Sequence, residues 1–70
     1  MVTFTFKYND GAEHVFDHIE TAEYGDGQRI EGNELLTHWF PIGYDFHLCS
    51  DDCNFTVSGS NLTYIEVESE

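Results

Sequence analysis

Near its start the chain carries seven residues in which apolar and polar side chains alternate: Val2-Thr3-Phe4-Thr5-Phe6-Lys7-Tyr8. A period of two, built from β-branched and aromatic residues, is typical of a strand that buries one face and exposes the other. Residues 9–11, Asn-Asp-Gly, follow at once and favour a turn, because these residue types tolerate left-handed backbone conformations. We therefore expect a β-hairpin whose second strand lies within residues 12–19.

The register of this hairpin depends on the length of its turn. A two-residue turn at Asp10 and Gly11 would set Phe4 opposite Asp17, whereas a three-residue loop that ends in a glycine bulge sets Phe4 opposite Phe16. We favour the three-residue loop because it pairs two aromatic rings across the strands.

Residues 17–31 give conflicting signals. Asp17, with Glu20 three residues later, resembles the start of a helix, whereas the residues around Thr21 suit a strand. The segment 24–29 is rich in Gly and Asp and indicates the tip of a second hairpin. The sequence alone does not decide between helix and strand before that tip.

A short helix is expected at about residues 34–40. Asn33 is a suitable N-cap, and Pro41 ends any helix that precedes it. Four apolar side chains between them would fall on one side of a helix: Leu35, Leu36, Trp39 and Phe40. We expect this helix to lie across the sheet with Trp39 buried in the core.

The last third of the chain returns to alternating patterns, in residues 44–49, 55–57 and 62–67. Two registers agree with each other: Leu48 opposite Phe55, and Val57 opposite Leu62. The sequence therefore predicts a mainly β protein, a small antiparallel meander or partly closed barrel of about five to six strands with the short helix packed across it.

Length and composition exclude several classes of protein. Seventy residues suffice for one compact domain, residues 1–70. A formal net charge of -12 argues against direct binding to nucleic acid or to an anionic membrane, and an aromatic content of 16% argues against disorder. Because no secretory signal pattern and no apolar segment of about 20 residues is present, we expect a cytoplasmic protein.

The residue types that bind zinc come together only at His47, Cys49 and Cys53. The C-x3-C spacing differs from the usual C-x2-C knuckle, and only one such pair exists. We therefore expect no metal and no cofactor. A small structural zinc-binding domain remains an alternative, as does a disulfide between the two cysteines.

Catalysis is not expected from this sequence. Abundant carboxylates would raise the pKa of a cysteine thiol and so disfavour a thiolate nucleophile. The segment Gly25-Asp26-Gly27 places an aspartate where a phosphate would have to bind. Pairs of carboxylates, as used in glycoside hydrolysis, do not indicate catalysis here, because such pairs are expected by chance among fourteen Asp and Glu residues.

The acidic charge indicates the function that we favour, a non-enzymatic protein-binding module that engages a basic surface of a larger cytosolic partner. Glu66, Glu68 and Glu70 alternate along the last strand, roughly 6.8 Å apart. Aromatic contacts are expected from three tyrosines, Tyr24, Tyr44 and Tyr64. Two alternatives remain: the acidic row imitates the phosphates of a nucleic acid, or it merely keeps the protein dissolved. In size and charge the chain resembles short proteins common in phage and prophage genomes.

Overall fold

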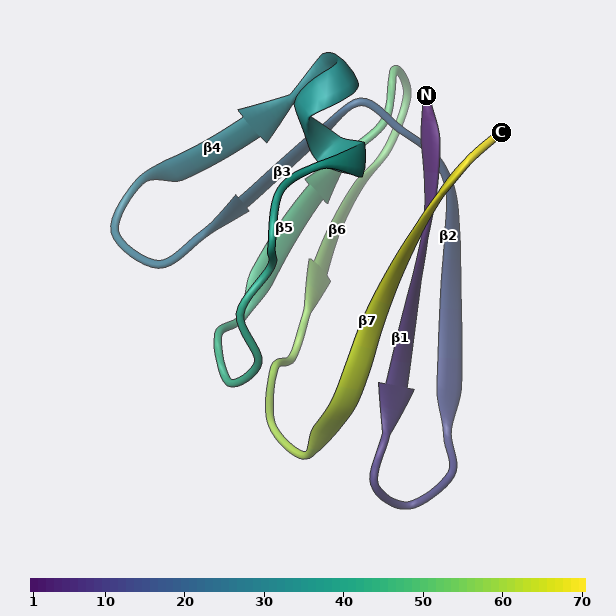
Figure 1. The fold of residues 1–70 in the computed structure, drawn as a ribbon, viewed down its shortest axis with the longest axis vertical. Helices are drawn as coiled ribbons and strands as arrows, with labels where there is room; N and C mark the ends of the chain where they lie inside the picture. Colours follow the sequence, from purple (N-terminus) through teal and green to yellow (C-terminus); the bar gives the residue numbers. More distant parts are fainter.

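The structure, a computed structural model, describes residues 1–70 and consists of antiparallel strands joined by short turns (Figure 1). Its elements in chain order are β1 (Val2–Tyr8), β2 (Glu13–Ile19), β3 (Thr21–Tyr24), β4 (Gln28–Glu31), the 3-10 helix η1 (Gly32–Leu36), β5 (Phe46–Cys49), β6 (Asn54–Val57) and β7 (Leu62–Ser69). None of its helices is long and apolar enough to cross a membrane.

The strands form two separate sheets, with the orders β2-β1-β7 and β4-β3-β5-β6. Every pairing is antiparallel, and strands account for 54% of the residues, which confirms the prediction of a mainly β protein. The sheets do not close into a barrel, and the strands do not follow one another as a single meander. These two finer expectations were wrong.

The first hairpin adopts the register that pairs aromatic rings. Phe4 lies opposite Phe16, and the N–H of Tyr8 donates to the carbonyl of Ala12 at 2.9 Å, so the loop has three residues. Gly11 ends the loop with φ +94°, a left-handed conformation that glycine adopts without steric cost. The three-residue turn with its glycine bulge is therefore confirmed.

The segment that gave conflicting signals is extended. Residues 21–24 and 28–31 form a hairpin, with Tyr24 opposite Gln28 at its tip, so the second hairpin is confirmed. The register between β5 and β6 is confirmed too, since Leu48 lies opposite Phe55. The two registers confirmed here and the second hairpin are all formed by strands that follow each other in the chain, so that the turn itself brings the two strands together.

The partner of β7 differs from the prediction. Val57 does not pair with Leu62, because β7 pairs with β1 and sets Ile65 opposite Phe6 and Val67 opposite Phe4. A register shift near the start of β7 reverses the face of the strand, so that Leu62 as well as Ile65 and Val67 can turn inward. β7 thus continues the apolar face of β1, which a pairing with β6 would not have done.

The expected helix over residues 34–40 and the buried Trp39 were both wrong. Only a 3-10 turn forms, over Gly32–Leu36, and Trp39 is 93% exposed. Asn33 does not cap it, and nucleating so short a helix is costly. Leu35 alone of the four apolar residues is fully buried, at 1% exposure. Beyond the turn the chain has no regular secondary structure, and Phe40 packs against the core while its neighbour Trp39 is exposed.

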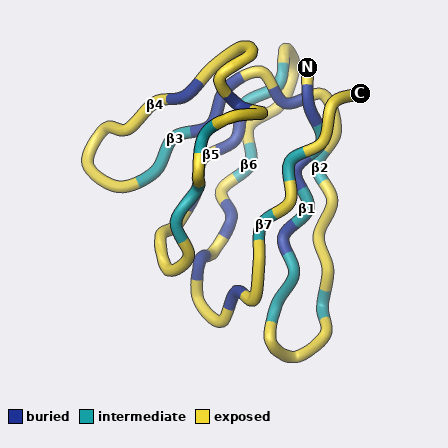
Figure 2. The backbone as a smooth tube through the Cα atoms, viewed as in Figure 1, coloured by how far each residue is buried: buried dark blue, intermediate teal, exposed yellow.

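One apolar core joins the two sheets, and Figure 2 shows it as buried positions on both sheets, with the hairpin tips exposed. Its members are Val2, Phe4, Phe6, Ile19, Ala22, Ile30, Leu35, Phe46, Leu48, Val57 and Leu62. The rings of Phe6 and Phe46 cross between the sheets with their centroids 5.5 Å apart. The outward sides of both sheets are consequently free for other roles.

Candidate functional site

The outward side of sheet β2-β1-β7 gathers several of the predicted site residues, and we call it the acidic face. It consists of the residues that alternate with the buried ones: Thr3, Thr5, Lys7, Glu13, Val15, Asp17, Tyr64, Glu66 and Glu68. In the centre, Thr5 of β1 lies opposite Glu66 of β7, and Thr3 lies opposite Glu68. The acids therefore flank a row of small polar side chains.

Glu66 and Glu68 form a close pair of acids on this face. The negative charge of Glu68 raises the pKa of Glu66 above its ordinary value, and a hydrogen bond between the two side chains adds to the shift. The charge of Glu13, on the far strand of the sheet, acts in the same direction. A raised carboxyl pKa means that the ionised form of Glu66 is disfavoured where it stands.

Neither Lys nor Arg of the chain neutralises this pair. The Nζ of Lys7 lies 3.9 Å from Glu13 Oε2 and donates a hydrogen bond to the carbonyl of Gly11 at 3.2 Å. Arg29 is on the other sheet and contacts Glu23 and Glu31. Since these are the only two Lys and Arg residues of the sequence, Glu66 and Glu68 have no Lys or Arg partner within the molecule.

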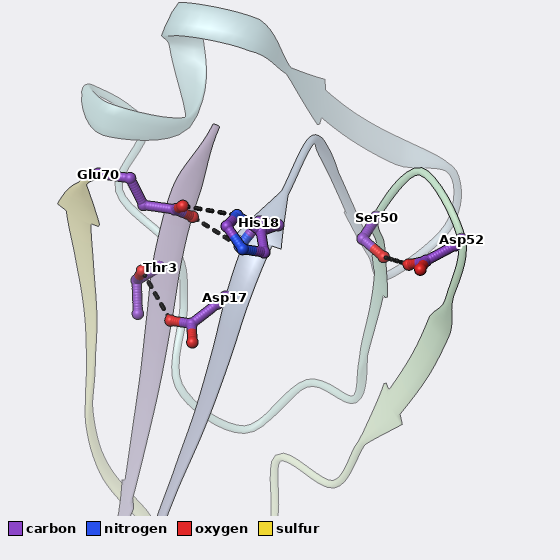
Figure 3. Close-up of polar contacts among 6 residues, drawn as sticks. All are labelled: Thr3, Asp17, His18, Ser50, Asp52 and Glu70. Carbon is purple, nitrogen blue, oxygen red and sulfur yellow. Dashed lines mark hydrogen bonds and ion pairs between the residues drawn. The ribbon is translucent and has the colours of Figure 1, made fainter.

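Glu70, the third predicted acid, has a different role. Its carboxylate lies 2.7 Å from His18 Nδ1 and accepts the backbone N–H of His18 at 2.6 Å, as Figure 3 shows. His18 occupies the bulge of β2 with φ +59°, an uncommon conformation for a residue other than glycine. The contact ties the end of β7 to β2 across β1, so Glu70 is committed to an internal bond.

The three predicted tyrosines do not lie together. Tyr64 is on the acidic face, opposite Lys7, and is 44% exposed. Tyr24 is half-buried at the end of β3, with its hydroxyl 2.7 Å from His38 Nε2 and its ring centroid 5.8 Å from that of Tyr44. Tyr24 and Tyr44 thus lie together but away from Tyr64, at the end of β3 on the other sheet and in the loop before β5.

The three candidate zinc ligands do not form a metal site. No group of three His, Cys, Asp or Glu side chains in the structure could hold a metal ion, and both cysteines are free. Cys53 is exposed in the turn after β5, where the charge of Asp52 raises the pKa of its thiol. Ser50 and Asp52 shape that turn through the hydrogen bond between them at 3.2 Å (Figure 3). A thiol with a raised pKa is a poor nucleophile near neutral pH.

Sequence reasoning missed the contribution of β2 to the acidic face. Asp17 accepts a hydrogen bond from the Thr3 hydroxyl at 3.0 Å (Figure 3). Val15 is exposed and lies opposite Thr5. The alternation of Ile65 and Val67 with Glu66 and Glu68 matches that of β1. This match could have indicated that β1 and β7 pair and that the acids of β2 and β7 share one face.

Comparison with protein-family models, with curated proteins and with solved structures finds no match for this chain. The function must therefore be argued from the residues of the acidic face themselves.

Proposed function

We propose that this chain is a small non-enzymatic protein-binding module whose acidic face engages a basic surface of a larger cytoplasmic partner. The observation that carries the proposal is the pair Glu66 and Glu68, exposed, adjacent and without a Lys or Arg partner in the molecule. A Lys or Arg from a partner, placed between these carboxylates, would stabilise their ionised forms. Binding would therefore give Glu66 and Glu68 the positive counter-charge that no Lys or Arg of the chain provides.

The rest of the acidic face suits a protein interface. Val15 and Tyr64 are exposed on it and offer apolar and aromatic contact area beside the charges. Thr3 and Thr5 between them are small, so the centre of the face contains no bulky side chain. The net charge of -12 would speed the encounter with a basic partner at low ionic strength.

Capture from a cytoplasmic extract at low salt tests this proposal. Three immobilised proteins are compared: the wild type, E66Q/E68Q on the acidic face, and E23Q/E31Q on the other sheet. Both variants lose two carboxylates, so they have equal net charge. We expect a basic protein that the wild type and E23Q/E31Q retain, that E66Q/E68Q loses, and that rising salt releases. Equal retention by all three proteins, or no such protein, would contradict the proposal.

Imitation of a nucleic acid is the second candidate, and it has weaker support. The backbone positions of Glu66 and Glu68 keep the spacing of a strand, roughly 6.8 Å, but their carboxyl groups approach each other closely and so do not form an open row of separate charges. The third carboxylate of the row, Glu70, is bound to His18 and is not free to continue it. DNA or RNA that displaces the captured partner from the wild type would favour this candidate over a general basic surface.

A further inference from the structure

The longest strand of the molecule, β7, has one unpaired edge. β1 pairs with it on one side, and no strand pairs with it on the other. The turn at residues 58–61 leads from β6 into β7, yet β6 pairs with β5 alone. Alternate residues of β7 therefore direct their backbone N–H and C=O groups away from β1, where nothing in the sheet accepts or donates to them.

This edge is more regular than the other three sheet edges. β4 and β6 have four residues each, and β2 is interrupted by its bulge at His18. β7 pairs with β1 in unbroken register from Tyr64 to Ser69. η1 packs beside β7, at the end of the molecule that holds both termini (Figure 1). An added strand would therefore begin beside Leu62, at the other end of β7, and run along the edge toward Glu66 and Glu68.

The side chains of β7 define what kind of strand fits this edge. Glu66 and Glu68 are exposed on the acidic face, while Ile65 and Val67 are half-buried on the opposite side. A strand that pairs with β7 places its own side chains beside these, alternately on the two sides of the sheet. Lys or Arg at every second position would meet the acids, and aliphatic residues between them would extend the apolar side.

We propose that an extended segment of the basic partner, with Lys or Arg alternating with aliphatic residues, adds to β7 as a fourth strand of sheet β2-β1-β7. This inference rests on the proposed function and names the form in which the partner binds. A second copy of the chain fits poorly, because its own Glu66 and Glu68 would stand against the same acids. The acids that prevent self-pairing thus select a basic strand.

Synthetic peptides test the added strand. In one peptide Lys and Val alternate, and in a second peptide of equal composition all Lys residues precede all Val residues. We expect the alternating peptide to bind the wild type about tenfold more tightly or better, because only its pattern allows main-chain pairing with both sets of side chains placed correctly. E66Q/E68Q should weaken that binding, and E23Q/E31Q should not.

Backbone methylation distinguishes a paired strand from a charged ligand. The alternating peptide is N-methylated either on its Lys residues or on its Val residues, which removes the N–H donors from one edge or from the other. A peptide that pairs with β7 uses a single edge, so one isomer should bind and the other should fail. Amide hydrogen exchange should slow at alternate residues of β7 when the binding isomer is added.

The outcomes separate the two proposals. Equal binding of the alternating and block peptides, or of both methylated isomers, would overturn the added strand and leave the acidic face as a binding surface for charge alone. Failure of every peptide to bind the wild type at low salt would overturn both. Protection of β7 amides that grows with protein concentration in the absence of peptide would show that a second copy occupies the edge, and would also overturn the inference.

Discussion

The two sheets carry acids on their outward sides and differ in how those acids are compensated. On sheet β4-β3-β5-β6, the guanidinium of Arg29 lies 3.7 Å from Glu23 and 3.3 Å from Glu31. On the acidic face of sheet β2-β1-β7, four carboxylates face a single cation, Lys7, which is paired with Glu13. Glu23 and Glu31 therefore share one cation, whereas Asp17, Glu66 and Glu68 have no Lys or Arg partner.

The difference does not arise from the fold, because both sheets are antiparallel and alternate inward and outward side chains in the same way. It arises from register. Arg29 lies opposite Glu23 and Lys7 opposite Glu13, whereas Glu66 and Glu68 lie opposite threonines. A compensated face gains little from a basic partner, while Glu66 and Glu68 would gain a counter-charge from one. The register of β1 with β7 thus leaves Glu66 and Glu68 without a counter-charge and available for binding, whereas the register of β3 with β4 places Glu23 opposite Arg29.

The largest effect is expected where the two sheets are joined. Gly59 lies in the turn between β6 and β7, and its N–H donates to Asp45 Oδ1 at 2.9 Å. A β-carbon at this position would lie 1.9 Å from the backbone oxygen of Tyr44. We expect Gly59→Ala to lower the free energy of unfolding by about 3 kcal/mol or more, because backbone atoms must shift to make room. Urea denaturation measures the loss.

Gly27→Ala is the matched control for that substitution. Gly27 has φ +89°, but no atom lies within 4 Å of the point that a β-carbon would occupy, so alanine there meets conformational strain without a clash. We expect a cost of about 1–2 kcal/mol. If the two substitutions cost the same, the clash with the Tyr44 backbone is not what makes Gly59 intolerant of a side chain.

The parts of the fold that could be predicted are those fixed by neighbouring residues. Alternation and turn chemistry sufficed for the hairpin that sets Phe4 opposite Phe16 and for the pair Leu48 and Phe55. The partner of β7 could not be deduced in this way, because β7 has apolar residues on both faces and its register with β1 involves residues about 60 positions apart. The spacing of Leu36 and Trp39 suited a helix, but the short segment before Pro41 forms a 3-10 turn followed by residues without regular secondary structure.

Two neighbouring aromatic residues, Phe40 and Trp39, test the corrected structure of that segment. Phe40 is half-buried, with its ring centroid 5.3 Å from that of Phe4, while Trp39 is almost fully exposed. We expect Phe40→Ala to cost about 2 kcal/mol or more and Trp39→Ala to stay within about 0.5 kcal/mol. Thermal unfolding compares them. A larger loss for Trp39→Ala would restore the helix that the sequence suggested.

The different contacts of Glu70 and Glu68 predict a smaller difference in the free energy of unfolding. Glu70 accepts a backbone hydrogen bond and contacts the ring of His18, so Glu70→Ala should lower the free energy of unfolding by about 1 kcal/mol. Glu68→Ala, two residues earlier, removes a carboxylate without a cation partner and should cause no loss. Urea denaturation at low salt makes the comparison. Equal losses would mean that Glu70 is as available for binding as Glu68.

Only part of the candidate site could be read from the sequence. Alternation places Glu66, Glu68 and Tyr64 along one strand, and the structure brings Glu66 and Glu68 to one exposed face with Tyr64. The commitment of Glu70 could not be predicted, because it depends on a bulge that turns the N–H of His18 toward the far edge of the sheet. The alternation of residues along one strand can be predicted from neighbouring positions. Whether an acid finds a cation partner depends on how all the strands of the sheet are arranged.

The smallest expected effect is the pH dependence that Glu66 imposes. Because Glu68 raises its pKa in the folded state, the folded protein holds the proton of Glu66 more tightly than the unfolded chain does. The contribution of Glu66 to stability is therefore complete below the ordinary carboxyl pKa and is lost as pH rises through the raised value. The melting temperature of the wild type relative to that of E66Q should fall as pH increases from about 4 to 7.

E31Q is the control that connects this titration to the comparison of the sheets. Glu31 is exposed like Glu66, but it contacts Arg29 at 3.3 Å, so at neutral pH its loss should lower the melting temperature slightly or leave it unchanged. E66Q should raise the melting temperature at neutral pH, and added salt should shrink that gain by screening the repulsion from Glu68. If E66Q and E31Q shift the melting temperature in the same direction, the acids of the two sheets are compensated alike. The acidic face would then have no excess charge to offer a basic partner.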